Sequence, residues 1–253
     1  MFLPSLSVAI ITFNEERIIE KTVSAVSTWV DEVIVVDSYS TDETVNILKK
    51  FDVKLYQRKW EGYSSQKNYA ISKCTGEWIF SLDADEILTV ELRNEILNVI
   101  NSPNNYDGFK IKRKFYINNK WIRFGGYYPD YQLRLFKKES NALFSERLVH
   151  ESLQLEGKTG FLKNDIEHYA YKSFDDYVSS LGAYAKFAAN EIKDRRFYLP
   201  LIRSLWTFSY RYFVRLGFLE GILGFKLAKA YSHYVYDKYK LAEELRNKSR
   251  EIR

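Results

Sequence analysis

The N-terminal third of the chain alternates short apolar runs with stretches of helical periodicity. The apolar runs occupy residues 7–11, 33–36, 53–57 and 78–82, and each has the length of a buried strand. Strands that alternate with helices build parallel sheets with helices packed on their faces. The sequence therefore predicts a parallel, doubly wound α/β sheet, in which ligands bind beyond the carboxyl ends of the strands.

Three short patterns predict where helices begin and end around this sheet. Thr12–Glu15 and Ser40–Glu43 have the Ser/Thr-x-x-Glu spacing of a capping box, which predicts a helix start at each. Residues 64–72 have helical character, and Gly76 is expected to close that helix.

The fourth apolar run ends in a cluster of carboxylates, Asp83, Asp85 and Glu86. Clustered carboxylates repel one another unless a cation or a donor-rich ligand offsets their charge. A divalent metal that carries a phosphate would offset it. On spacing alone, an acidic turn before a helix that starts near Thr89 is an equal alternative.

Polar residues follow the other predicted strands as well. The carboxyl ends of neighbouring parallel strands meet at one edge of a sheet, so these side chains are expected to form one site with the carboxylates. The residues at strand ends are Thr12, Asn14, Asp37, Ser38 and Asp83.

The middle of the chain has a different pattern. From residue 107 to 124, apolar and polar residues alternate around Asn118–Asn119, which predicts an antiparallel hairpin, and a further strand is expected at 132–136. Gly125–Gly126 is either a plain turn or a place where the backbone approaches a ligand closely.

The C-terminal region is helical, aromatic and basic. Residues 193–253 contain 14 Lys and Arg against 6 Asp and Glu, a net charge of +8, whereas the remainder carries −3. These helices either pack on the core or on a second subunit, or they form a membrane-surface element. Nucleic acid is disfavoured because the charge lies along apolar helices and not in a compact groove. An apolar stripe comprises Leu201, Leu205, Phe208, Tyr212, Leu216, Leu219, Leu223 and Leu227, which Gly217, Gly221 and Gly224 are expected to interrupt.

Composition limits the number of domains and the cellular compartment that we expect for this chain. A chain of 253 residues with 46% hydrophobic and 28% charged residues is expected to form one large domain, alone or with an appendage. The single cysteine, Cys74, excludes an intramolecular disulfide and fits a reducing compartment. The N-terminus lacks the basic region of a signal peptide, and charged residues interrupt the most apolar stretch, so we expect a cytoplasmic protein that does not span a membrane.

Three motifs in order carry a family resemblance: Thr12–Glu15, Val35–Asp42 and Leu82–Asp85, the last with an Asp-x-Asp (DXD) pattern. With them the chain resembles family 2 glycosyltransferases of the GT-A fold over roughly residues 5 to 170. Arg134–Lys138, Val149–Glu151 and the Tyr-rich tail are similar to the branch of lipopolysaccharide inner-core β-glucosyltransferases. The expected domains are 1–172, a GT-A domain with a Rossmann-like, mostly parallel sheet and an antiparallel acceptor-side hairpin, and 173–253, a helical appendage.

The resemblance implies roles for individual residues. The family's nucleotide-binding positions correspond here to Thr12, Asn14, Glu15, Asp37, Ser38, Lys67 and Asp83. The positions that would ligate Mn²⁺ or Mg²⁺ are Asp83, Asp85 and His168, with Asp85 the first choice. The catalytic base is expected downstream of the metal motif. Many relatives have Glu-Asp in that region, whereas this chain has His150-Glu151, so Glu151 is the first choice and Asp130 and Glu146 are alternatives.

The implied activity is an inverting, metal-dependent transfer of a hexose, with glucose favoured, from a UDP-sugar to a saccharide acceptor of a membrane glycolipid such as lipopolysaccharide core. The alternatives are transfer to polyprenyl phosphate and a non-catalytic nucleotide-sugar-binding protein. The expected partners are the UDP-sugar, a lipid-linked saccharide and, through the C-terminal helices, a membrane surface. The expected location is peripheral, on the inner face of the cytoplasmic membrane, and self-association is left open.

Overall fold

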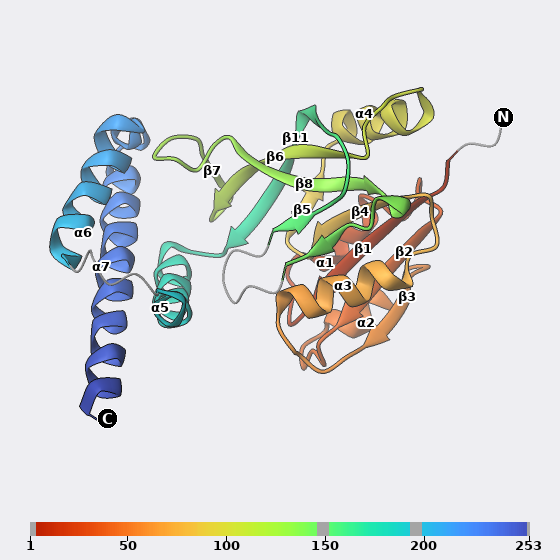
Figure 1. Cartoon of the computed structure of the whole chain (residues 1–253). Helices are drawn as coiled ribbons and strands as arrows, with labels where there is room; N and C mark the ends of the chain where they lie inside the picture. Colours follow the sequence, from red (N-terminus) through yellow and green to blue (C-terminus); the bar gives the residue numbers. More distant parts are fainter. Residues whose placement is uncertain (1–3, 146–151, 193–198, 252–253) are drawn as a thin grey trace. The chain divides into compact units, whose positions relative to one another are not determined.

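The computed structural model describes residues 4–145, 152–192 and 199–251, except the side chains of 191 and 248–251. Its chain forms two compact units (Figure 1). The first unit combines Met1–Lys114 with Asp130–Ala170, and the second combines Phe115–Pro129 with Tyr171–Arg253. The hairpin that was expected from the alternating pattern therefore contributes its tip to the second unit.

Four parallel strands form the part of the sheet that the N-terminal pattern predicts. Their order is β3-β2-β1-β4, so β1 lies between β2 and β4. In register, Thr12 pairs with Asp37 and Ile11 with Asp83, and the three strands therefore end at nearly the same level. The parallel strands are β1 (Leu6–Thr12), β2 (Glu32–Asp37), β3 (Lys54–Gln57) and β4 (Trp78–Asp83).

Further strands extend the sheet beyond β4 in the order β8-β6-β11-β5, and β7 pairs with β6. The β6–β7 hairpin is confirmed, and its turn residues Asn118 and Asn119 both have positive φ, a conformation that Asn tolerates. The expected strand at 132–136 is confirmed as part of β8. The bounds are β5 (Glu86–Leu88), β6 (Gly108–Ile117), β7 (Lys120–Ile122), β8 (Asp130–Lys137) and β11 (Thr159–Tyr171), and a separate pair consists of β9 (Leu143–Phe144) and β10 (Leu153–Gln154).

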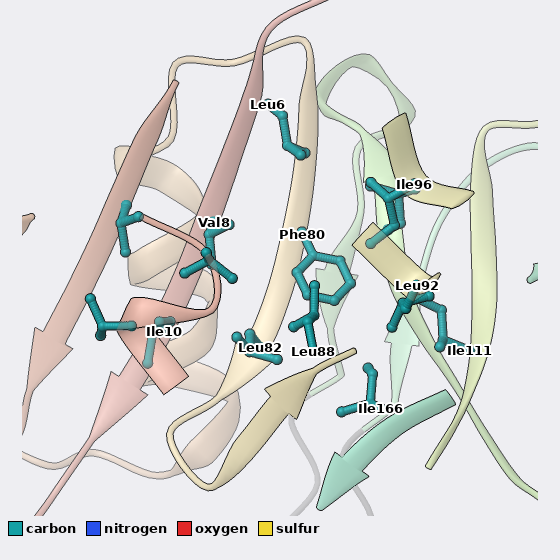
Figure 2. Close-up of a cluster of buried hydrophobic side chains, with 14 of the residues drawn as sticks. Leu6, Val8, Ile10, Phe80, Leu82, Leu88, Leu92, Ile96, Ile111 and Ile166 are labelled. Atoms are coloured by element: carbon teal, nitrogen blue, oxygen red, sulfur yellow. The ribbon is translucent and has the colours of Figure 1, made fainter. Parts of the chain in front are cut away.

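Helices cover both faces of the parallel strands. Successive side chains of a strand point to opposite faces, so Val8 and Ile10 join one core cluster with α1, α2 and α4, whereas Ala9 joins another with α3. Figure 2 shows the first cluster, in which Phe80 of β4 lies among apolar side chains of neighbouring elements. The predicted α/β fold with helices on both faces is confirmed. The helices are α1 (Ile19–Ser24), α2 (Thr44–Leu48), α3 (Tyr63–Lys73) and α4 (Val90–Asn101), and a 3₁₀ turn, η1, spans Lys138–Ser140.

Both predicted capping boxes are wrong. Thr12 is the last residue of β1, α1 begins several residues later, and neither α1 nor α2 has a side-chain cap. The loops after β1 and β2 bind each other instead: the Asn14 N–H donates to Ser40 Oγ at 2.9 Å, and the Glu15 N–H donates to Thr44 Oγ1 at 2.8 Å. Hydroxyl groups of the second loop thus accept hydrogen bonds from N–H groups of the first loop that a local cap would otherwise satisfy.

Gly76 also has a different role from the one predicted. Helix α3 ends at Lys73 and its C-cap, Cys74, is already extended, so Gly76 does not close the helix. A Cβ atom at Gly76 would lie 2.7 Å from Ser7 Oγ. The glycine therefore permits a close approach to β1, where its N–H donates to the same hydroxyl at 2.8 Å.

The second unit contains the C-terminal helices. The predicted apolar stripe is interrupted between Leu216 and Gly221, both of which have positive φ. The expected break at Gly224 is wrong, because this residue lies inside a helix, where a Cβ would come within 1.9 Å of the Gly217 carbonyl oxygen. No helix in the described ranges is long and apolar enough to cross a membrane. The elements are α5 (Phe174–Glu191), α6 (Pro200–Ser209), the π-helical turn η2 (Tyr210–Val214), the 3₁₀ turn η3 (Gly217–Glu220) and α7 (Ile222–Glu251).

At the start of β2, Glu32 links three segments of the first unit. Its carboxylate accepts from Ser7 Oγ at 2.5 Å and from Lys54 Nζ at 2.7 Å, and it also accepts from the Thr75 N–H and hydroxyl. Burial alone would raise the pKa of Glu32, but these donors lower it from 4.5 to about 2. A carboxyl group with a lowered folded-state pKa stabilises the fold above its unfolded pKa, and this contribution is lost as the pH falls.

Replacement of this carboxylate should make stability less dependent on pH. We expect Glu32→Gln to lower the free energy of unfolding by roughly 1–3 kcal/mol at neutral pH, because charge-assisted hydrogen bonds are lost. The deficit should shrink as the pH falls from 4.5 toward about 2, where the native carboxylate also becomes protonated. Urea titrations at several pH values measure this, with Glu20→Gln on the exposed surface of α1 as the control. A deficit that is constant with pH would contradict the assignment.

Candidate active site

The carboxyl ends of β1, β2 and β4 bring the predicted polar residues to one edge of the sheet. Thr12 and Asp37 are register partners at the ends of β1 and β2, and Asp83 is the last residue of β4. This juxtaposition follows from parallel pairing of adjacent strands, each of which ends in a polar residue. The structure therefore places these three residues at a common edge, as the sequence predicts.

Asp37 is fully buried and accepts hydrogen bonds from three donors of its own chain. These are the Ser40 N–H at 3.0 Å, Ser40 Oγ at 2.5 Å and Gln57 Nε2 at 3.3 Å. A carboxylate has about four acceptor positions, so this group retains capacity for one more donor. Ser40 also accepts from Asn14, which ties the first loop to the aspartate.

Near the strand end that carries Asp37, two buried side-chain oxygens have no hydrogen-bond partner in the described part of the chain. Gln66 donates through Nε2 to Ser38 Oγ at 2.8 Å, but its Oε1 has no partner. Thr12 Oγ1 is likewise buried and unpartnered. Buried polar atoms are nearly always satisfied in native proteins, so two such atoms near one strand edge indicate a surface that a polar ligand can complete.

Asp83 lies between two cations. Its Oδ1 contacts Lys67 Nζ at 2.8 Å, and its Oδ2 contacts Arg134 Nη2 at 2.5 Å. Burial by itself would raise the pKa of Asp83, but Arg134 and Lys67 hold it well below its usual range. Asp83 is therefore ionised at any physiological pH, and both of its oxygens already face positive charge.

Glu86 is buried more completely than Asp83 and extends the same network. Its Oε1 accepts from Arg134 Nη2 at 2.5 Å and from Arg113 Nη1 at 3.3 Å, whereas its Oε2 accepts from the Asp83 N–H at 2.9 Å. On its other side, Arg113 donates to Asp130 Oδ2 through Nε at 2.8 Å and through Nη2 at 2.5 Å. Two arginines thus join three carboxylates and fix the turn after β4.

Asp85 points to a different partner. Its Oδ2 lies 3.2 Å from His168 Nε2, and its carbonyl oxygen accepts from the Tyr169 N–H at 2.9 Å. The contact arises because β5 pairs antiparallel with β11, which places His168 opposite Glu86. Burial would raise the pKa of Asp85, but the neighbouring imidazole lowers it.

The side chains at Asp85 suit a divalent metal better than those at Asp83, because Asp85 lies beside an imidazole whereas Asp83 already faces two cations. No group of three or more His, Cys, Asp and Glu side chains in the described ranges is arranged to hold a metal ion by itself. Asp85 and His168 do supply adjacent carboxylate and imidazole ligands, a set that suits Mn²⁺. A metal with so few protein ligands would complete its coordination with oxygens of a bound diphosphate and water.

Of the three candidates for the base, one is within the described residues. Burial would raise the pKa of Asp130, but Arg113 lowers it, and a lowered pKa makes a carboxylate a weaker base. Its Oδ2 is also occupied by the guanidinium of Arg113. Glu146 and Glu151, together with His150, lie outside the described residues.

Comparison with known proteins identifies the family. The model described as "Glycosyl transferase family 2" matches residues 7–153, more than half of the chain. The chain belongs to this family. Among its relatives, the uncharacterized glycosyltransferase RC0292 of Rickettsia conorii is 32% identical over 87% of this chain and 83% of that protein. The lipopolysaccharide core biosynthesis glycosyltransferase LpsC of Rhizobium meliloti is 27% identical over 86% of this chain and 82% of that protein, in agreement with the resemblance to lipopolysaccharide enzymes.

Solved structures share the fold. Mannosyltransferase PcManGT of Pyrobaculum calidifontis, in complex with GDP-Man and Mn²⁺, has a TM-score of 0.52 at 16% identity and covers 96% of this chain and 74% of that one. S. aureus TarS 1-349, in complex with UDP-GlcNAc, has a TM-score of 0.51 at 16% identity and covers 96% and 92%. The expected GT-A fold is confirmed.

Reasoning from the sequence found the carboxylates but missed what holds them. Arg113 lies in the alternating pattern of the predicted hairpin, and Arg134 belongs to a motif of the family resemblance, but neither pattern predicts an ion pair. The available signal was an arginine inside each of two predicted strands, because a buried arginine needs a carboxylate partner. Arg134 lies in β8, the strand next to β4, and Arg113 lies in β6, the strand beyond β8. Glu86, which the sequence groups with Asp83 and Asp85 in one carboxylate cluster, contacts the Asp83 N–H and the two arginines.

Removal of Arg134 should destabilise the fold strongly. We expect Arg134→Leu to lower the free energy of unfolding by about 3–5 kcal/mol, because a completely buried Glu86 then loses its nearest counter-ion. Chemical denaturation measures the effect. The control is Arg17→Leu, an exposed arginine whose hydrogen bond to the Tyr169 carbonyl should contribute about 0.5 kcal/mol. Equal losses in the two variants would show that the network does not depend on Arg134.

Proposed function

We propose that this glycosyltransferase moves a hexose, glucose in the first instance, from a UDP-sugar to a saccharide acceptor of a membrane glycolipid such as lipopolysaccharide core. The observation that carries the proposal is the common edge at which Asp37 and Asp83 end the two strands that flank β1, and near which Asp85 meets His168. Nucleoside-binding and phosphate-binding groups would lie side by side in this arrangement. The similarity to a lipopolysaccharide core enzyme supports the acceptor class.

The nucleoside end of the donor would lie against β1 and β2. Asp37 keeps one acceptor position, which suits the uracil N3–H or a ribose hydroxyl. Thr12 Oγ1 and Gln66 Oε1 are buried acceptors that a hydroxyl-bearing ligand would satisfy. Asn14 and Glu15 belong to the loop that Ser40 and Thr44 hold in place, so they would form the rim of this pocket.

The diphosphate would lie beside the turn after β4. Asp85 and His168 are the residues that would hold Mn²⁺ or Mg²⁺, and the metal, when bound, neutralises the departing diphosphate. An imidazole ligand favours Mn²⁺. Lys67 offers a second positive charge at this position, and Asp83 keeps its ammonium group in place. Asp83 itself faces Lys67 and Arg134, so its role would be to organise these cations or to bind ribose.

The acceptor hydroxyl requires a base on the face opposite the departing diphosphate if the reaction inverts the anomeric carbon. Glu151 remains the first choice, because Asp130 is bound to Arg113 and has a lowered pKa. An acceptor that is already an anion, as polyprenyl phosphate is, would need no such base. The glycolipid and polyprenyl phosphate proposals therefore differ in their dependence on Glu151.

A panel of nucleotide sugars tests the donor site. We expect UDP-glucose or another UDP-sugar to raise the melting temperature in the presence of Mn²⁺, because a ligand that binds only the folded state stabilises it. Asp37→Asn should weaken UDP binding roughly 10-fold to 100-fold, as expected for the loss of a charged acceptor. Asp52→Asn, at an exposed position outside the strand ends, is the matched control. The donor assignment fails if no UDP compound changes the melting temperature.

Substitution of Glu151 tests the proposed base. Glu151→Gln should lower the rate of sugar transfer to a saccharide acceptor by about 10²-fold to 10⁴-fold while UDP binding is retained, because only proton removal is lost. Glu156→Gln provides a comparison with an exposed glutamate nearby in the sequence. Turnover close to that of the native enzyme would favour the polyprenyl phosphate acceptor, and loss of UDP binding would indicate a structural role.

A further inference from the structure

The polarity of helix α6 is reversed relative to that of a helix on a water-soluble protein. Its most hydrophobic side chains face outward: Trp206 is 68% exposed and Leu201 is 61% exposed, whereas Ser204 is buried. A surface helix normally directs its apolar stripe to the core and its polar residues to water. Of the apolar stripe predicted from the sequence, Leu201 and Leu205 therefore face outward, whereas Leu227 is buried.

Polar groups, together with the ring contact of Phe208 with Phe225, hold the inner side of α6 against α7, the helix beside it in the same unit (Figure 1). Ser204 Oγ donates to the Ser232 carbonyl oxygen at 2.9 Å and lies 3.1 Å from Ser232 Oγ. Arg203 donates to Tyr239 Oη at 2.9 Å, with its guanidinium 4.6 Å from the centre of that ring. Small residues and polar contacts between helices are the means by which helices associate in lipid, where apolar side chains gain nothing by facing inward.

The exposed apolar side chains form one continuous surface, the outer α6 face. Their spacing follows adjacent positions on successive helical turns and continues through η2. Exposed apolar side chains also occur in η3 and at the start of α7, where Leu219 is 53% and Ile222 is 80% exposed. Contiguous apolar surfaces of this kind mark interaction sites. The outer α6 face consists of Leu201, Ile202, Leu205, Trp206, Tyr210, Phe213 and Val214.

The exposed charged side chains of the segment that carries the outer α6 face are all basic. Between residues 199 and 229 the exposed charged side chains are Arg215, Lys226 and Lys229. The one acidic residue of this segment, Glu220, is turned inward, where it accepts from the Arg123 N–H at 2.8 Å and pairs with Lys120 Nζ at 3.4 Å. An apolar surface bordered by cations is complementary to a surface that presents anions above hydrocarbon.

A hollow of about 240 Å³ opens at the border of the outer α6 face. Two of the residues that line it, Arg123 and Arg215, carry guanidinium groups, and Val214 and Leu216 supply apolar walls. Guanidinium groups match the geometry of phosphate oxygens. The hollow thus combines a place for a phosphate with apolar surroundings, as a phospholipid headgroup and the start of its acyl chains require.

We propose that the outer α6 face lies in the interface of an anionic phospholipid bilayer, with Arg123 and Arg215 at the headgroup phosphates. Helix α6 has 10 residues and is therefore about 15 Å long, half of the roughly 30 Å of hydrocarbon, so it lies in one leaflet and does not span the bilayer. A second copy of the chain is a poorer occupant, because pairing of two such faces would bring their cationic borders together.

Vesicle binding by the full-length protein tests the proposal. We expect the protein to sediment with vesicles of phosphatidylglycerol and phosphatidylcholine and to bind vesicles of phosphatidylcholine alone more weakly. Leu205→Gln/Trp206→Gln should reduce binding at least tenfold, because two exposed apolar side chains are removed from the outer α6 face. Val90→Gln/Phe161→Gln, which removes two exposed apolar side chains from the first unit, is the matched control and should bind normally.

The charge contribution is measured separately. Arg123→Gln/Arg215→Gln should reduce binding to the anionic vesicles roughly 30-fold and leave binding to neutral vesicles unchanged, because each basic residue contributes about 1 kcal/mol, or about fivefold, to attraction by anionic lipid. Lys49→Gln/Lys50→Gln, with the same loss of charge at the end of α2, is the control. Bromine-labelled acyl chains should quench tryptophan emission in the native protein, and Trp206→Phe should remove most of that quenching.

Several outcomes would overturn the proposal. They are a native protein that stays in the supernatant, equal binding by the Leu205/Trp206 variant and its control, or a concentration-dependent dimer that this variant abolishes, which would assign the surface to a second copy. Circular dichroism melts confirm that each variant is folded. Vesicle binding does not depend on the proposed reaction. A protein that binds vesicles but no UDP compound would refute the proposed function alone, and the converse result would refute this inference alone.

Discussion

The stability of the first unit depends on the arginines that neutralise one buried carboxylate, Glu86. Glu86 has no exposed surface, and an unpaired carboxylate at such a depth would cost several kcal/mol or take up a proton. Arg134 offsets its charge and also contacts Asp83, while Arg113 continues the network to Asp130. The same ion pairs that make this burial tolerable therefore fix the turn after β4, and the candidate metal ligand Asp85 lies within that turn.

The parallel part of the fold and the position of the site follow from local sequence, because apolar runs and strand-end polar residues act at short range. Asp37 and Asp83 come to the same edge of the sheet once the strands that carry them pair in parallel with β1. The contacts of Arg113, Arg134 and His168 could not be predicted from local sequence. They depend on which later strand pairs with which earlier strand. The capping boxes failed for a related reason: acceptors on a distant loop competed successfully for the same N–H groups.

An apolar stripe predicts that one face of a helix avoids water, but it does not predict what that face meets. The spacing of Leu201 and Leu205 is the same whether they enter a protein core or a bilayer. The direction in which the stripe faces depends on the contacts of the opposite face, where Ser204 meets Ser232 across two packed helices. That contact could not be inferred from α6 alone, because it requires the register of α6 against α7.

The pairing of β5 with β11 has a consequence for the order in which the protein assembles during synthesis. The strands that carry Thr12, Asp37 and Asp83 are complete early in the chain, whereas His168 emerges from the ribosome much later. Non-local pairings form slowly because a long loop must close first. The nucleoside side can therefore take shape while the chain is still growing, but Asp85 meets its histidine only after β11 has been made, so an incomplete chain would lack the paired carboxylate and imidazole.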